Sequence, residues 1–135
     1  MAYWLVKTEP ENFSYEDLVR LGRDRWNGVR NFAALKYLRA MRPGDRVFIY
    51  HTGKEKAIVG VAEVLTDPYP DPALQDARYP VTDLAPRYRL PRTVALKTIK
   101  ADPAFGEWLL TRQPRLSVMP VSAEHWWQIH QMAGQ

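Results

Sequence analysis

Strand and helix signals follow one another in an irregular order along this chain. Apolar residues predict a short strand at 3–6, followed by two helices at 15–21 and 32–39. Two strands, at 46–51 and 57–65, then come without a helix between them. A doubly wound parallel sheet needs regular β–α–β alternation and a glycine-rich turn after a strand, and this chain has neither. The order instead favours an α+β fold in which short helices decorate a small curled sheet or barrel.

The second half of the chain is rich in proline. Residues 68–91 hold six of the eleven prolines, which favours a loop with extended pieces over a helix. One long or broken strand is predicted over 88–99. Asp102 is followed by a proline and is expected to cap a helix that carries residues 105–109. A last strand at 116–121 then leads into a terminal helix.

Single polar residues and glycines mark where elements begin and end. Ser14, Asn31 and Ser122 each precede a helical pattern and are expected to act as N-caps. Gly22 is expected to end the first helix. Gly60 lies inside a strand, where a glycine indicates a bulge or the close approach of another group.

Length and composition place the chain among ordinary globular proteins. With 135 residues, 46% of them apolar, we expect a single domain over residues 1–135. The absence of cysteine excludes disulfides, cysteine nucleophiles and thiolate metal sites. No run of about 18 apolar residues and no signal peptide are visible, so we expect no membrane partner and a cytoplasmic location.

The positive charge of the chain is concentrated in one segment. Residues 20–46 contain eight Lys or Arg against two Asp, a net charge of +6, while the whole chain carries only +4. A basic segment on a near-neutral body is typical of a surface that binds nucleic acid or another anion. The alternative is a solvated, arginine-rich helix surface, and charge alone leaves both open.

Signatures of the common catalytic and cofactor sites are absent from the sequence. There is no nucleophile elbow, no phosphate-binding glycine loop and no paired-histidine zinc motif. The three histidines are His51, His125 and His130, and the last two are five residues apart, so they do not share a helix face. We therefore assign no catalytic residues, no metal ligands and no cofactor.

Two clusters carry side chains suited to binding a nucleotide. Residues 26–31 (Trp-Asn-Gly-Val-Arg-Asn) combine an aromatic plane, a guanidinium group and two amides. Such a set can stack on a base, bond its edge and hold a phosphate. In the alternative interpretation Trp26 packs in the core and Asn31 only caps a helix. Residues 50–52 (Tyr-His-Thr) lie at a strand end, where they either line a pocket or form an ordinary terminus.

Several sequence blocks in a fixed order resemble the EVE domain family and together span nearly the whole chain. The resemblance implies a PUA-like fold, a small curled β-barrel decorated with short helices. It also implies kinship with YTH domains, which hold a methylated adenine of RNA in an aromatic cage, and an association with methylated or oxidised-methyl cytosine in DNA. The matching blocks are Trp4–Pro10, Phe13–Tyr15, Trp26–Asn31, Met41–Asp45, Tyr50–Thr52, Gly60–Val64, Tyr69–Pro72 and Arg115–Val121.

The hypothesis that follows is a non-catalytic module that binds nucleic acid, DNA in preference to RNA, and accepts one modified base. By the resemblance, Trp26 lies where the YTH relative has a cage tryptophan, so it should stack on the base and be partly open to solvent. The residues expected around the base are Trp26, Asn31, Tyr50, His51, Thr52 and Ser117. The residues expected to hold phosphate are Lys7, Arg30 and Arg115.

Two other function classes stay open at this point. An enzyme acting on a nucleotide or small metabolite would use His51 as general base, and Glu9 is the one candidate for its titratable partner. An interaction module would use residues 68–91 as a protein contact, which requires a large exposed apolar patch. The oligomeric state is also left open.

Overall fold

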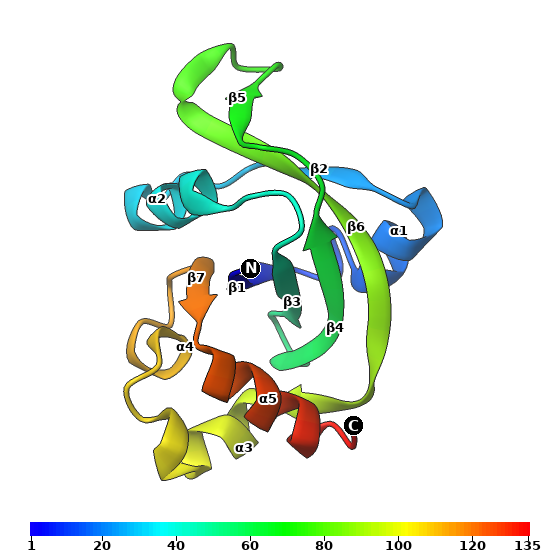
Figure 1. The fold of residues 1–135 in the computed structure, drawn as a ribbon, viewed down its shortest axis with the longest axis vertical. Coiled ribbons are helices and arrows are strands. Elements are labelled where there is room, and N and C mark those ends of the chain that lie inside the picture. Colours follow the sequence, from blue (N-terminus) through cyan, green and yellow to red (C-terminus); the bar gives the residue numbers. More distant parts are fainter.

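The computed structural model describes all 135 residues and places seven strands in one curled sheet (Figure 1). The strands run in the order β2-β6-β4-β3-β1-β7, and β5 pairs with β6 outside this path. Only β1 and β3 pair in parallel. This open half-barrel confirms the expected curled α+β fold. The strands are β1 (Tyr3–Thr8), β2 (Asp24–Trp26), β3 (Arg46–His51), β4 (Ala57–Val64), β5 (Tyr69–Asp71), β6 (Asp76–Ala95) and β7 (Val118–Val121).

Short helices surround the sheet. Helix α2 contacts both β6 and β7 and so lies across the open side of the curl, while α3, α4 and α5 gather at the opposite end of the molecule (Figure 1). None of the helices is long and apolar enough to cross a membrane. The helices are α1 (Tyr15–Leu21), α2 (Phe32–Ala40), α3 (Leu96–Ala101), the 3₁₀ turn η1 (Pro103–Phe105), α4 (Leu109–Arg112) and α5 (Ala123–Met132).

The expected helix caps are confirmed. Ser14, Asn31 and Ser122 each accept a hydrogen bond from the backbone N–H three residues later. Gly22 ends α1 in the left-handed region at φ 80°, where a side chain would be strained. A helix cap depends only on a few neighbouring residues, which is why the sequence alone predicts these positions.

Residues 68–91 are extended and not helical, as expected, but they form paired strands where a loop with extended pieces was expected. Residues 69–71 form β5, and β6 continues as one strand of 20 residues from Asp76 to Ala95. A proline cannot donate to the ladder, but Pro86 lies at a register shift and Pro91 in a stretch without paired partners on β4. The prolines therefore occupy irregular positions that a strand tolerates.

Three further boundaries differ from expectation. The strand expected to reach residue 99 ends at Ala95, where α3 begins. Asp102 caps only the turn η1, and α4 follows as a separate helix. Residues 24–26 form the edge strand β2, which the sequence pattern did not reveal because it is only three residues long.

A buried carboxylate ties the first strand to the turn before β3. The side chain of Asp45 is 5% exposed and accepts hydrogen bonds from the backbone N–H of Ala2, the indole N–H of Trp4 and the backbone N–H of Arg42. Two of the sequence blocks, 4–10 and 41–45, therefore meet at one hydrogen-bonded centre. This centre fixes the start of β1, whose other end carries Lys7.

The glycine inside β4 is required by a neighbouring aromatic ring. A Cβ added at Gly60 would lie 2.6 Å from the ring of Tyr15, whose hydroxyl donates to the carbonyl of Val61 at 2.9 Å. The ladder between β3 and β4 also shifts register beside Gly60. The expected close approach and bulge are both confirmed.

Replacing Gly60 with alanine should destabilise the protein by about 1–3 kcal/mol, because the tyrosine ring must move to admit the methyl group. The free energy of unfolding from guanidinium titration measures this cost. Gly106→Ala is the matched control, since its Cβ would lie 3.4 Å from the nearest atom at an ordinary helical φ of −61°. Equal costs for the two variants would show that the Tyr15 contact has no special role.

Candidate nucleic-acid interface

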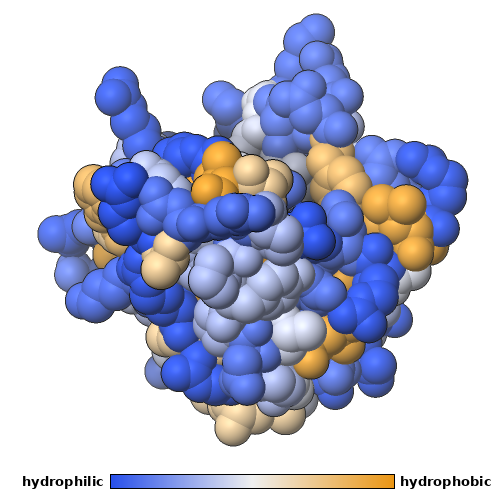
Figure 2. All heavy atoms as spheres, turned by 90° about the horizontal axis from the view of Figure 1, so that it is seen from above, coloured by the Kyte–Doolittle hydropathy of each residue, from blue (hydrophilic) through white to orange (hydrophobic).

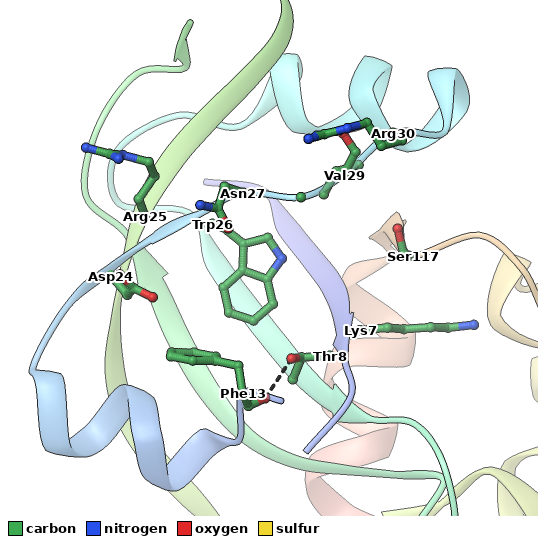
Figure 3. A pocket seen from close by; sticks show the side chains of 11 residues that line it. Lys7, Thr8, Phe13, Asp24, Arg25, Trp26, Asn27, Val29, Arg30 and Ser117 are labelled. Atoms are coloured by element: carbon green, nitrogen blue, oxygen red, sulfur yellow. Dashed lines mark hydrogen bonds between the residues drawn. The ribbon is translucent and has the colours of Figure 1, made fainter. Parts of the chain in front are cut away.

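A cavity of about 240 Å³ lies between β2, the end of β1 and the segment before β7 (Figure 3). Its volume is below the usual range of about 300–1,000 Å³ for drug-sized ligands and suits a smaller fragment. Four of the residues expected at the site line it: Lys7, Trp26, Arg30 and Ser117. The other lining residues are Thr8, Phe13, Asp24, Arg25, Asn27, Gly28 and Val29. We call this space the Trp26 cavity.

Trp26 belongs both to the core and to the wall of this cavity. Its side chain is only 7% exposed and packs in the core, so the expectation that Trp26 is partly open to solvent is wrong. Phe13 meets its ring edge-on at 6.0 Å. The indole nitrogen points toward the gap bordered by Val29 and Ser117 (Figure 3). No acceptor within the protein bonds the indole N–H. Trp26 therefore presents an unused donor to the cavity.

Basic side chains dominate the rim of the Trp26 cavity. Lys7 donates to the carbonyl of Pro114 at 2.9 Å, and burial together with the charge of Lys100 lowers the pKa of its ammonium group. Arg30 lies over the ring of Tyr79 at 4.9 Å. Asp24 is the single acidic residue among the lining residues. The rim can therefore hold an anion.

Two of the expected residues line a neighbouring cavity of about 270 Å³ instead. Asn31 and Arg115 line it. The other lining residues are Ala33, Gln113, Pro114 and Leu116. The side-chain oxygen of Asn31 accepts the backbone N–H of Ala34 at 3.1 Å. This oxygen caps α2, and the amide nitrogen of Asn31 makes no hydrogen bond within the protein.

Tyr50 and Thr52 line a third cavity, which adjoins the first one at Lys7. The hydroxyl of Thr52 donates to the carboxylate of Glu9 at 3.1 Å. Burial raises the pKa of the Tyr50 hydroxyl, and Lys7 lies over the Tyr50 ring at 5.5 Å. Eight of the nine expected residues thus divide among three adjoining spaces, and the ninth, His51, lies outside all of them.

His51 is buried behind the cavities rather than within one. Its Nε2 accepts the backbone N–H of Tyr15 at 3.0 Å, so that nitrogen carries no proton. Its Nδ1 then carries the proton and donates to Glu55 at 2.7 Å. The carboxylate partner of His51 is therefore Glu55, and the pairing with Glu9 considered from the sequence is wrong.

The residues at the end of β3 instead position the wall of the Trp26 cavity. The backbone N–H of Thr52 donates to the carbonyl of Thr8 at 2.9 Å, and the Thr8 hydroxyl donates to the carbonyl of Phe13 at 2.6 Å. With the bond from Tyr15 to His51, these contacts hold the segment 8–15 against the sheet. Phe13, which the sequence interpretation did not assign to the site, is placed against Trp26 in this way.

The family comparison gives a match over almost the whole chain. A family model described as the EVE domain matches residues 2–132. Thymocyte nuclear protein 1 of Gallus gallus is 34% identical over 91% of this chain, and that of Mus musculus is 32% identical over 90%. The matched region covers 65% of the chicken protein and 69% of the mouse protein, so these relatives are longer than the shared domain.

Solved structures with the same fold include bacterial and human proteins. An NMR structure from Rhodopseudomonas palustris is 40% identical with a TM-score of 0.94, covering 99% of this chain and 94% of that one. Human THYN1, solved in complex with DNA containing 5-methylcytosine, is 27% identical with a TM-score of 0.90, covering 100% and 99%. An ASCH protein from Zymomonas mobilis, 13% identical with a TM-score of 0.60 over 97% and 95%, shares the fold alone.

Replacing His51 with alanine should lower the free energy of unfolding by about 1–3 kcal/mol, because the buried Tyr15 N–H loses its acceptor. Chemical denaturation measures the loss. Glu55→Ala is the control, since it removes only a partner that is 41% exposed and should cost at most about 1 kcal/mol. If both variants lose the same stability, the bond to Tyr15 does not hold the segment.

Proposed function

This chain belongs to the EVE domain family, and from that premise we propose that it is a non-catalytic module that binds DNA. One methylated or oxidised-methyl cytosine would enter the Trp26 cavity. The observation that carries the proposal is the unpaired indole N–H of Trp26, which faces a cavity with a basic rim. The complex of the human relative with DNA containing 5-methylcytosine supports the choice of ligand.

Each side chain of the cavity has a role in this proposal. Trp26 and Phe13 form an aromatic corner against which the base lies, and the indole N–H donates to an acceptor on its edge. The Ser117 hydroxyl, which bonds no protein group, offers a second edge contact. Lys7 and Arg30 hold the phosphate of the bound nucleotide.

The magnitudes require contacts beyond the base itself. Extracting a paired base costs a few kcal/mol, and stacking on an aromatic side chain returns about 1–3 kcal/mol. The two nearly cancel, so the Trp26 cavity alone would bind weakly. Asn31 and Arg115 line the neighbouring cavity and would contact an adjoining nucleotide, and phosphate contacts would supply the remaining affinity.

The two alternative function classes have less support. A general base must reach the proton that it removes, and His51 lines none of the cavities. A protein contact through residues 68–91 needs a large apolar patch. The end of the molecule that carries the β5–β6 hairpin is largely hydrophilic, with apolar side chains in small separate groups (Figure 2).

A single domain over residues 1–135 and a cytoplasmic location stay proposals from the sequence.

Two substitutions at Trp26 should separate stacking from hydrogen bonding. Trp26→Ala should weaken binding of an oligonucleotide with one 5-methylcytosine about 10- to 100-fold, because the stacking surface is lost. Trp26→Phe keeps an aromatic ring but removes the N–H, and should cost about 2- to 10-fold. Fluorescence anisotropy at fixed salt measures both, alongside the melting temperature of each variant.

Trp127→Ala is the matched control, since that tryptophan is 61% exposed on α5 and lines none of the cavities described. It should leave affinity unchanged. The proposed function would be contradicted if the wild-type protein bound the modified and unmodified oligonucleotides equally well. It would also be contradicted if Trp26→Ala bound the modified oligonucleotide as tightly as the wild-type protein.

A further inference from the structure

Five lysines from three separate parts of the chain meet beside the Trp26 cavity. Lys7 comes from the end of β1, two come from the β3–β4 loop and two come from α3. They line two adjoining depressions of about 240 and 400 Å³. We call this surface the lysine groove, and its basic residues are Lys7, Lys54, Lys56, Lys97 and Lys100.

Few acidic side chains lie near the lysine groove, and only Lys54 also lines a depression with Glu9 and Glu11. None of its five lysines forms an ion pair. Its one acidic lining residue, Glu55, is hydrogen-bonded to His51. A concentration of like charges without counter-charges is relieved when an anion binds.

The arginines of the segment 20–46 differ in this respect. Arg20, Arg23 and Arg46 form ion pairs with Asp17, Asp83 and Glu63, respectively. Arg42 donates to the backbone carbonyls of residues 39 and 41. Three of the eight positive charges in this segment are therefore already paired with carboxylates, whereas the lysine groove is visible only in three dimensions.

The groove is continuous with the base site and has a fixed shape. Lys7 lines both the Trp26 cavity and the lysine groove, and its side chain extends away from the indole (Figure 3). Lys56 lies in the left-handed region at φ 45°, which is uncommon for a side chain of this kind. Its carbonyl accepts the backbone N–H of Leu96 at 2.8 Å, so the β3–β4 loop is held against the start of α3.

We propose that the lysine groove binds backbone phosphates of the same DNA strand whose modified base occupies the Trp26 cavity. This inference rests on the proposed function, because the strand leaves the cavity at Lys7. A lysine ammonium group binds phosphate as a point charge and does not select a base sequence. The groove therefore supplies affinity, and the Trp26 cavity supplies the choice of base.

The test is the salt dependence of binding to a short single-stranded oligonucleotide, with or without one central 5-methylcytosine. The triple variant Lys54→Ala, Lys97→Ala, Lys100→Ala removes three exposed charges that make no hydrogen bond, and alanine suits the two positions in α3. The slope of log K against log salt should fall in magnitude by about 2. Affinity at 0.1 M salt should fall about 100-fold, while the preference for the modified base is retained.

A charge-matched control removes Lys36, Arg39 and Arg92, which are exposed, form no ion pair and lie outside the groove. An equal loss of slope in this control would assign the effect to net charge and overturn the proposal, as would an unchanged slope in the lysine variant. Circular dichroism checks that both variants fold. Wild-type binding without base preference contradicts the proposed function alone, because the slope on the unmodified oligonucleotide still tests the groove. Absence of any wild-type binding overturns both.

Discussion

The contact of Tyr15 with the backbone of β4 determines where one wall of the candidate site lies. The ring occupies the space that the missing side chain of Gly60 leaves, and its hydroxyl bonds the carbonyl of Val61. His51 accepts the backbone N–H of the same residue from inside the protein. Both ends of Tyr15 are thus held by the sheet, and Phe13, two residues earlier, is carried into contact with Trp26. The shape of the Trp26 cavity therefore depends on residues that do not line it.

The electrostatic organisation follows from the folding of distant segments. Arginines that are close in the sequence take different partners, and three of them, Arg20, Arg23 and Arg46, pair with carboxylates. Lysines that are far apart in the sequence come together because the end of β1, the β3–β4 loop and helix α3 lie side by side. Lys7 lines both the Trp26 cavity and the lysine groove, and burial and the charge of Lys100 lower the pKa of its ammonium group.

Features that depend on a few neighbouring residues could be predicted from the sequence. Ser14, Asn31 and Ser122 were assigned correctly as caps because a cap depends on a few neighbouring residues. The sequence blocks identified the family and, with it, the curled fold. The strand predicted over 88–99 covers only the second half of β6. Residues 76–87 are not predicted as a strand because their prolines argue against one, and irregular pairing with β4 is what makes Pro86 acceptable.

The candidate site could be predicted only in part. Lys7, Trp26, Arg30 and Ser117 line one cavity, but Asn31 and Thr52 line neighbouring ones and His51 lines none. A strand end presents alternate residues to opposite faces, so the three positions 50–52 could not all point into one cavity. Which of these three residues line a cavity depends on the curl of the sheet. The meeting of the five lysines in the lysine groove depends on the same curl.

The spectrum of the indole N–H groups tests the central claim most directly. The protein has five tryptophans. The indole N–H groups of Trp4 and Trp108 donate to the carboxylate of Asp45 and the carbonyl of Pro120, respectively. In a ¹H–¹⁵N titration with an oligonucleotide carrying 5-methylcytosine, the Trp26 indole resonance should shift, while those of Trp4 and Trp108 stay in place. The unmodified oligonucleotide should shift Trp26 only at higher concentration. A Trp26 resonance that does not move while the backbone signals of the basic surface do would contradict the account.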